Sequence, residues 1–271
     1  MNEGLAVFAK SLIGLYRWEP LRSCPNCEAD RFAPHSTHRF GPLAIRLRSC
    51  GSCGLVAQSP RLTEPSLRRF YASDYHAHQG GRGAAHAAGQ FERGMRRGAY
   101  IVRWLDEQGI RFRGGLVFEL GCSYGGVLEA FRREGCRVQG CDVSAEAVAY
   151  GAARGLDLAA GSLEALPRAE QPADLILLSH VLEHVADPQR LLQRMRAALA
   201  PRGVLYVEVP GMRNPRTQQR RYAQPAHLWY FTLETARRVV EANGFRFMSG
   251  NEVVQGVFCP DAEAPVGAST T

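Results

Sequence analysis

The segment Gly115-Leu-Val-Phe-Glu-Leu-Gly-Cys-Ser-Tyr-Gly-Gly126 is the most informative part of the sequence. Its apolar run over 115–120 predicts a short buried strand, and the glycines after it predict a tight turn before a helix over 127–134. Glycines in such a turn let the backbone approach a ligand, which then faces the first amides of the helix. The dinucleotide-binding pattern is absent, because Ser123 replaces its second glycine.

Strands and helices alternate on the C-terminal side of this segment. Strands are expected over 137–142, 174–178 and 203–209, and helices over 145–154 and 189–199, the first of them capped by Ser144. This alternation predicts an α/β fold with a parallel sheet covered on both faces. A ligand is then expected at the carboxyl ends of the strands.

Polar residues follow several of these strands. Glu119 would repel a pyrophosphate, so it favours a cationic ligand. Asp142 can accept hydrogen bonds from both hydroxyls of a ribose, although a strand-end cap is the alternative. The turn 162–164 is placed to contact an adenine edge, and 179–188 directly follows the most apolar strand.

Two Cys-x-x-Cys pairs precede this region, separated by residues 28–49. Two such turns at the ends of a hairpin over 32–47 predict a closed four-thiolate site for structural zinc in a ribbon. Iron in a rubredoxin-like site, and uncoordinated or disulfide-bonded cysteines, are the alternatives. The predicted ligands are Cys24, Cys27, Cys50 and Cys53. The other cysteines are interpreted as small buried hydrophobic residues, namely Cys122, Cys136, Cys141 and Cys259.

The remaining segments complete a five-part division of the chain. Residues 1–20 are expected to form an amphipathic helix that packs on the body, with a membrane-surface anchor as the alternative. The ribbon occupies 21–60, and a connector over 61–90 holds a helix (66–75) and a mobile loop (77–90). The main domain spans 91–258, and a flexible tail covers 259–271. The apolar stripe of the first helix comprises Leu5, Phe8, Leu12, Leu15 and Tyr16.

Composition excludes several classes of protein. No apolar run is long enough for a membrane span, and the N-terminus is unlike a secretory signal, so a reducing, cytoplasmic location is expected. The net charge of +7 first suggests a nucleic-acid partner, but the arginines are dispersed and Lys10 is the only lysine. We interpret this charge as a diffuse solvated surface. The loop 213–221 is the one place where arginines could meet an anionic acceptor, such as a nucleotide sugar.

Taken together, these motifs resemble those of class I S-adenosylmethionine-dependent methyltransferases. The resemblance covers about residues 91–250, and the ribbon in front of it is similar to a bacterial subgroup linked to sugar, polysaccharide and natural-product methylation. It implies a Rossmann-like, mostly parallel seven-stranded sheet, with S-adenosylmethionine and structural zinc as cofactors. The motifs that carry it, in chain order, are Glu119-x-Gly121, Asp142, Ser162-Leu163, His180-Val-Leu-Glu-His184-x-x-Asp187-Pro188 and Gly203…Pro210.

The resemblance also assigns roles to individual residues. The implied cofactor-binding set is Glu119, Gly121, Cys122, Gly125, Asp142, Val143, Ser162, Leu163, Ser179, His180 and Tyr75. Tyr71, Tyr75 and His76 could close over the site as a lid, or the tyrosines could pack against the core. Ser162 stands where an aspartate often binds the adenine amino group, which is a departure from the family pattern.

Methyl transfer to a hydroxyl needs a base with a pKa near 7, which favours histidine. The candidates are His180, His227 and His184, and each could instead be structural. The preferred function is O-methylation of a small-molecule acceptor, anionic or glycosylated, in sugar or natural-product biosynthesis. Sugar C-methylation, RNA base methylation and an inert zinc-ribbon binding protein are the alternatives. Nucleic acid is disfavoured because the ribbon lacks interleaved aromatic and basic residues. The sequence carries no signal for an oligomeric state.

Overall fold

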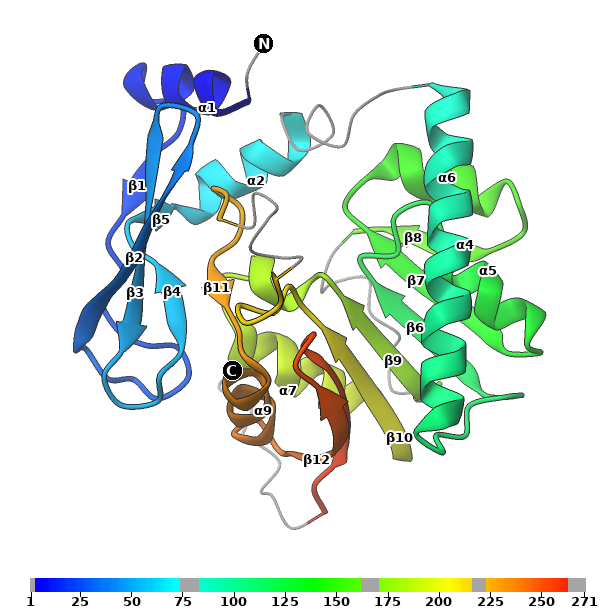
Figure 1. Ribbon diagram of the computed structural model, residues 1–271. Helices are drawn as coiled ribbons and strands as arrows, with labels where there is room; N and C mark the ends of the chain where they lie inside the picture. Colours follow the sequence, from blue (N-terminus) through cyan, green and yellow to red (C-terminus); the bar gives the residue numbers. More distant parts are fainter. Residues whose placement is uncertain (1–2, 74–82, 162–170, 216–222, 263–271) are drawn as a thin grey trace.

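A seven-stranded sheet forms the centre of this computed structural model, which describes residues 3–73, 83–161, 171–215 and 223–262 (Figure 1). Its strand order is β12-β13-β10-β9-β6-β7-β8. The strands from β8 to β10 pair in parallel, whereas β13 and β12 add antiparallel pairs. The predicted sheet is confirmed. The strands are β6 (Leu116–Leu120), β7 (Arg137–Asp142), β8 (Asp157–Ala160), β9 (Ala173–Ser179), β10 (Leu199–Glu208), β12 (Phe245–Asn251) and β13 (Gln255–Pro260).

Helices cover both faces of the sheet, and each face has its own core. On β9, Leu175 and Leu177 join one core with α4 and α5, whereas Ile176 and Leu178 join the other with α7 and α9. Because both faces are covered, β9 is apolar along its length. Ser144 caps α6 by accepting a hydrogen bond from the backbone of Ala147, as expected. The helices are α4 (Ala84–Glu107), α5 (Gly126–Arg133), α6 (Ala145–Ala152), α7 (Pro188–Ala198) and α9 (Leu233–Glu241).

Helix α4 corrects one expectation from the sequence. The loop expected over 77–90 is wrong for its second half, because α4 begins at Ala84, while residues 74–82 lie outside the described part. Alanines at 84, 85, 87 and 88 are strong helix formers and outweigh the nearby glycines. Further along, a Cβ on Gly98 would lie 2.7 Å from that of Ala130 on α5. Glycine therefore allows α4 and α5 to pack closely.

The N-terminal hairpin β2 (Phe32–Phe40) and β3 (Leu43–Cys50) confirms the predicted ribbon hairpin. It belongs to a four-stranded sheet of order β11-β4-β3-β2, completed by β4 (Val56–Gln58) and β11 (Trp229–Tyr230). A strand from the second half of the chain thus enters the N-terminal sheet. Short strands β1 (Trp18–Glu19) and β5 (Arg61–Leu62) pair beside it, and α2 (Glu64–Ser73) follows.

Helix α1 (Glu3–Leu12) packs through a face that differs from the predicted stripe. Leu5, Leu12 and Leu15 are 49%, 71% and 40% exposed, whereas Val7 is buried. A Cβ on Gly4 would lie 2.3 Å from a backbone oxygen of the β2–β3 turn. The small Gly4 therefore lets the helix contact the turn, and the predicted packing face is wrong at these leucines. None of the described helices is long and apolar enough to cross a membrane.

Candidate active site

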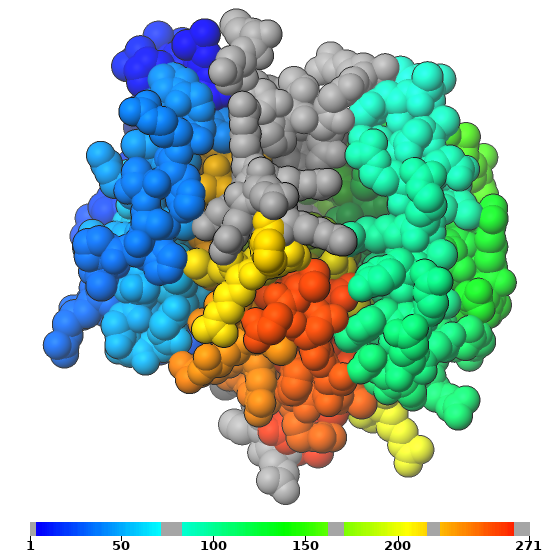
Figure 2. Space-filling view, in the orientation of Figure 1, coloured from blue at the N-terminus to red at the C-terminus, as the bar shows by residue number. Residues whose placement is uncertain are grey.

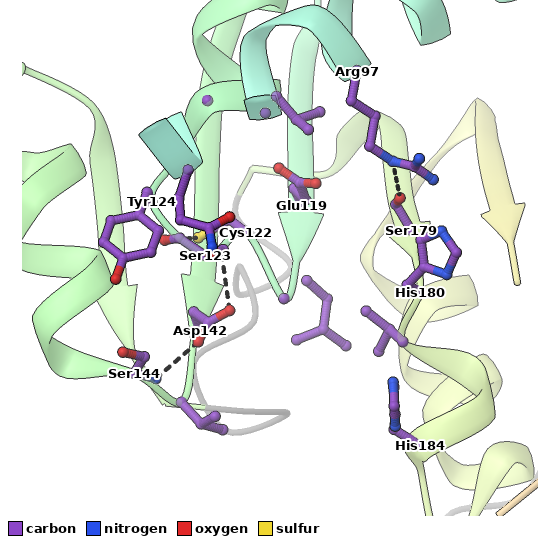
Figure 3. Close-up of a pocket in the computed structure, with 18 of the residues that line it drawn as sticks. Arg97, Glu119, Cys122, Ser123, Tyr124, Asp142, Ser144, Ser179, His180 and His184 are labelled. Carbon is purple, nitrogen blue, oxygen red and sulfur yellow. Dashed lines mark hydrogen bonds between the residues drawn. The ribbon is translucent and has the colours of Figure 1, made fainter. Parts of the chain in front are cut away.

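A cavity of about 500 Å³ opens at the carboxyl ends of β6, β7 and β9, where a parallel sheet is expected to bind its ligand (Figure 3). Helices α2 and α4 contribute further lining residues. Seven predicted cofactor residues line it, namely Glu119, Gly121, Cys122, Asp142, Val143, Ser179 and His180. Gly125 lies in the same β6–α5 turn.

Some predictions fall outside the described residues. These are Tyr75 and His76 of the possible lid, Ser162 and Leu163 of the adenine turn, and most of the arginine-rich loop 213–221. Tyr71, at the end of α2, is described and lines the cavity.

The turn between β6 and α5 has the left-handed backbone that its glycines predict. Gly121 and Gly125 have φ values of 76° and 80°. A Cβ on Gly121 would lie 2.8 Å from Cγ2 of Val181, so this position leaves no room for a side chain. Ser123 itself has a positive φ of 49°. The sequence departure at Ser123 therefore keeps a glycine-like conformation.

Glu119 is a buried carboxylate at the cavity wall, 3% exposed. Its Oε2 has no hydrogen-bond partner in the described part of the chain. Burial raises the pKa of Glu119 to about 8, with Asp142 adding to the rise and Arg97 opposing it. A buried carboxyl oxygen without a partner is costly, so this position suits a ligand that brings a cationic or donor group.

Asp142, at the end of β7, is held in place by two backbone amides. Its Oδ2 accepts from the N–H of Ser123 and its Oδ1 from the N–H of Ser144, each at 2.8 Å (Figure 3). The first contact joins the ends of β6 and β7, so the carboxylate has a fixed orientation. Val143 beside it is 61% exposed at the cavity mouth.

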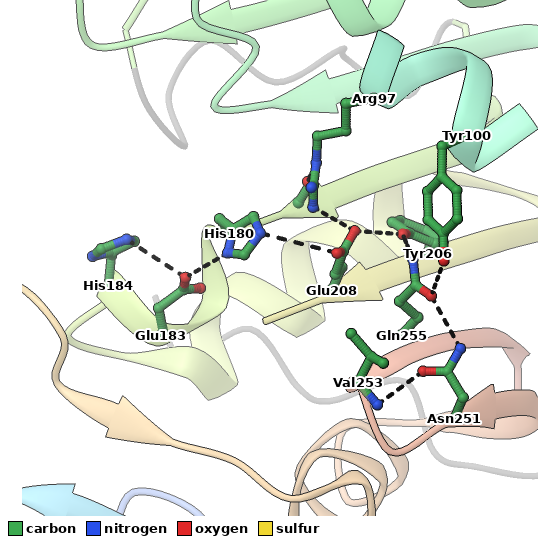
Figure 4. A network of polar contacts seen from close by, with 11 residues as sticks. Arg97, Tyr100, His180, Glu183, His184, Tyr206, Glu208, Asn251, Val253 and Gln255 are labelled. Atoms are coloured by element: carbon green, nitrogen blue, oxygen red, sulfur yellow. Dashed lines mark hydrogen bonds and ion pairs between the residues drawn. The ribbon is translucent and has the colours of Figure 1, made fainter. Parts of the chain in front are cut away.

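Arg97 on α4 is a site residue that the sequence did not reveal. Its Nε donates to Oγ of Ser179 at 3.0 Å, and its Nη2 forms an ion pair with Glu208 at the end of β10. Tyr206 donates to Glu208 Oε2 at 2.6 Å and accepts from Gln255 at 3.0 Å (Figure 4). Arg93 also lines the cavity. Arg93 and Arg97 are four residues apart, a spacing that places two side chains on the same face of a helix.

Two of the predicted histidines flank a single buried carboxylate (Figure 4). His180 Nδ1 lies 3.4 Å and His184 Nε2 lies 3.6 Å from Oε1 of Glu183. The His180 side chain is 44% exposed and borders the cavity, whereas that of His184 is 14% exposed. His184 Nδ1 lies 3.0 Å from the carbonyl oxygen of Ala226, which can only accept, so Nδ1 is the protonated nitrogen.

Glu183 is 1% exposed, and its Oε1 lies between the rings of His180 and His184. Burial raises its pKa, but the charges of His184, His180 and His227 outweigh burial and lower it to about 2. Glu183 is therefore ionised and attracts the imidazole rings around it. His227 is 7% exposed, and its ring centroid lies 4.7 Å from that of His184. Of the described histidines proposed as bases, only His180 and His184 line the cavity.

The four cysteines predicted as ligands come together, with their sulfur atoms within 4.8 Å of one another. The Cys24–Cys53 and Cys27–Cys50 sulfurs are 3.6 and 3.5 Å apart. Tetrahedral zinc with Zn–S bonds of about 2.3 Å requires roughly 3.8 Å, so the arrangement fits one ion. None of the eight cysteines forms a disulfide in this structure. Burial disfavours the Cys50 thiolate, yet backbone amides of Cys53 and Ser52 help to lower its pKa to about 7.

Known proteins match both the sequence and the fold. A family model described as a methyltransferase domain matches residues 92–249. A ubiquinone biosynthesis O-methyltransferase of Coxiella burnetii (strain RSA 493 / Nine Mile phase I) is 31% identical over 106 residues, which are 37% of this chain and 45% of that protein. The chain thus spans less than half the length of this curated relative.

Two solved structures share the fold at low identity. Burkholderia thailandensis 1,6-didemethyltoxoflavin-N1-methyltransferase, with bound S-adenosylhomocysteine, is 18% identical with a TM-score of 0.58, covering 84% of this chain and 100% of that one. The mitomycin 7-O-methyltransferase MmcR is 17% identical with a TM-score of 0.55, covering 72% and 60%. The family model covers more than half of this chain, which therefore belongs to the methyltransferase-domain family.

Proposed function

We propose that this enzyme methylates a hydroxyl group of a small-molecule acceptor, a sugar or natural-product intermediate, with His180 as general base. The observation that carries the proposal is the chemistry of a single cavity. Carboxylates lie on its β6–β7 side and histidines on its β9 side. The first set suits a cationic cofactor, and the second suits removal of a proton from an acceptor.

The carboxylate side fits S-adenosylmethionine, which supplies the methyl group when bound. The unpartnered oxygen of Glu119 would accept from the ammonium group of the cofactor, because a buried carboxylate needs such a partner. Asp142, fixed by two amides, would hold the ribose hydroxyls. Gly121 lets the cofactor approach the backbone of the turn.

The histidine side supports the choice of base. His180 Nδ1 lies 3.4 Å from Glu183, whereas Nε2 lies 4.0 Å from Oε1 of Glu208, the longer of the two contacts. An acceptor hydroxyl beside His180 would therefore transfer its proton to Nε2. The carboxylate of Glu183 is ionised and stabilises the imidazolium that forms. Tyr71, Val185 and Leu191 line the same cavity and provide apolar contacts for a small acceptor.

Two further observations narrow the proposal. The curated relative is named as an O-methyltransferase, which favours oxygen as the methylated atom, whereas the two solved structures are named as an N-methyltransferase and an O-methyltransferase and support the fold alone. The four clustered sulfurs favour zinc in a structural role, because four thiolates leave no open coordination position. The competing reactions are sugar C-methylation and RNA base methylation, and the experiment below distinguishes them from O-methylation.

An acceptor screen with [methyl-¹³C]S-adenosylmethionine tests the reaction. Glycosylated and phenolic hydroxyl compounds, nucleotide sugars and a short RNA are offered, and the ¹³C chemical shift of the product distinguishes O-, N- and C-methyl groups. We expect O-methyl products from hydroxyl compounds. Transfer only to carbon or to RNA would contradict the proposal.

The base is tested with His180→Gln, using His38→Gln on the distant strand β2 as the matched control. We expect His180→Gln to lower kcat at least a hundredfold at neutral pH and to abolish the acidic limb of its pH profile. S-adenosylhomocysteine affinity, read by calorimetry, should change less than threefold. Turnover and a pH profile like those of the control would show that His180 is not the base.

A further inference from the structure

The wall behind His184 is built from both halves of the chain. Strand β11 pairs antiparallel with β4, with Trp229 opposite Ala57 and Tyr230 opposite Val56. The four-stranded sheet β11-β4-β3-β2, which we call the cysteine-bearing sheet because β3 ends at Cys50, therefore includes Trp229 and Tyr230, close to His227 in the chain. Figure 2 shows the blue N-terminal residues lying against the orange and yellow segments from the later part of the chain.

The two parts also share one core. Phe40, Ile45 and Leu47 of the hairpin belong to the same buried cluster as residues of α7 and α9. Arg61 stacks its guanidinium over the ring of Trp229, 5.5 Å from the centroid, and Arg238 of α9 donates to the carbonyl of Cys53. A displacement of the hairpin β2–β3 would therefore be transmitted to β11.

Gln58, at the end of β4, makes the most direct of these connections. Its backbone N–H donates to the carbonyl of Leu228 at 2.9 Å. With its side-chain nitrogen facing the neighbouring carbonyls, the amide donates to Gln224 at 3.1 Å and to His227 at 2.9 Å. Gln58 is 0% exposed, so water cannot replace these donors. One residue thus fixes both ends of the turn 224–228.

The opposite side of this turn holds the acceptor-side residues. The N–H of Leu228 donates to the carbonyl of Glu183 at 2.8 Å, and the indole of Trp229 donates to Val185 at 2.6 Å. His184 donates through Nδ1 to Ala226, within the same turn. The orientation of the His184 ring is therefore set by a turn whose other carbonyls are bound by Gln58.

We propose that Gln58 is a positioning residue for the acceptor side of the cavity, holding His184 and His227 through the turn 224–228. The assignment of that side to the acceptor rests on the proposed function, whereas the positioning itself does not. The cysteine-bearing sheet thereby sets the shape of the acceptor side, while the Glu119 side depends on α4 and the β6–α5 turn. An amide is required at residue 58 because only two N–H groups on one nitrogen can bind both carbonyls.

The test compares Gln58→Met, which keeps the length of the side chain but removes both donors, with Gln139→Met, which removes an amide bonded to Asp157 on the far edge of the central sheet. The full-length proteins are labelled with [ε1-¹³C]histidine. His184→Gln and His227→Gln assign the two signals. Amide hydrogen exchange of peptides covering 182–186 and 223–231 is measured on the same proteins.

We expect Gln58→Met to move both histidine signals and to speed exchange in the two peptides at least tenfold. Affinity for S-adenosylhomocysteine should stay within twofold, and Gln139→Met should match the wild type. Gln58→Asn, which retains an amide that reaches one carbonyl only, should give an intermediate shift and serves if the methionine variant fails to fold.

Wild-type histidine signals and exchange rates in Gln58→Met, or in Gln58→Asn if it alone folds, would overturn the proposal. Turnover is not part of this test. A failed acceptor screen would refute the proposed reaction and leave the positioning result unaffected.

Discussion

Replacing Glu119 with glutamine should make the protein more stable and its cofactor binding weaker. The carboxyl is 3% exposed, and its Oε2 has no partner in the described part of the structure. Glutamine has nearly the same shape and carries no charge at any pH. The substitution therefore isolates the cost of ionising one buried group.

The size of the effect follows from the pKa. Burial raises the pKa of Glu119 from 4.5 to about 8. In the unfolded chain the carboxyl ionises at its ordinary pKa, whereas in the folded protein it stays protonated until about pH 8. Wild-type stability relative to Glu119→Gln is thus greatest below pH 4.5 and is lost as pH rises to 8. The loss is about 1.4 kcal/mol per pH unit, or about 3 kcal/mol between pH 5.5 and 8.

Urea unfolding of both proteins at half-unit steps from pH 5.5 to 8.5 measures this difference directly. The advantage of Glu119→Gln should grow with pH and level off above pH 8. Between pH 5.5 and 8 the difference in Tm between the two proteins should grow by roughly 6–12 °C. A difference in unfolding free energy that stays constant with pH would refute the assignment of a neutral, buried Glu119.

Ligand binding provides the complementary measurement. An ammonium group stabilises the ionised carboxylate, so wild-type affinity for S-adenosylhomocysteine should increase about tenfold per unit as pH rises toward 8. Glu119→Gln should bind more weakly at pH 8, with little change across the same range. Equal pH dependence in the two proteins would show that Glu119 does not meet the ammonium group.

Three other results are expected. Asp142→Asn should weaken S-adenosylhomocysteine binding by roughly tenfold in calorimetry, because it removes the charge that would accept the ribose hydroxyls; unchanged affinity would exclude that role. Ser144→Ala should lower the free energy of unfolding by about 1 kcal/mol in urea, because it removes the cap of α6, and an effect near zero would contradict it. The wild type should carry one zinc ion per chain by elemental analysis, and Cys53→Ser should lose it and melt at a lower temperature; zinc-free wild type, with the Tm of the variant unchanged, would argue against a structural ion.

The central strands were predictable because strands buried on both faces have continuous apolar sequences. The continuous apolar run at 174–178 and the Gly-rich turn after 120 each reflect local packing or backbone geometry. Helix α4 was not predictable in the same way. The glycines at 80, 81 and 83 favoured a loop over 77–90, whereas α4 begins at Ala84. Within this helix, a Cβ on Gly94 or Gly98 would lie 3.0 Å or less from an atom of α5. Gly94 and Gly98 therefore allow close packing of α4 against α5, a contact between two different helices that is not visible in the local sequence.

The candidate site shows the same division. Glu119, Asp142 and His180 were predicted to lie at one site because each is at or just after the end of a strand, and the ends of parallel strands meet at one edge of the sheet. Arg97 and Gln58 were missed, since their roles depend on partners 82 or more residues away in the chain. The exposed leucines of α1 were misplaced for a related reason, because a backbone contact at Gly4 chose the packing face of that helix.

The chain has a net charge of +7, whereas the charged residues around the described part of the cavity are mostly acidic. The site contains Glu119 and Asp142 at its wall, with Glu183 and Glu208 directly behind, whereas Arg93 and Arg97 are the arginines that line its described part. Arg97 is already paired with Glu208. Glu119 itself is protonated below about pH 8. The carboxylates of Asp142 and Glu183 therefore remain against Arg93 in a low-dielectric pocket, where each charge acts more strongly than at the surface. A dispersed basic surface, screened within about 10 Å by salt, contributes little there. The local field thus favours a positively charged ligand such as a sulfonium, whatever the sign of the whole chain.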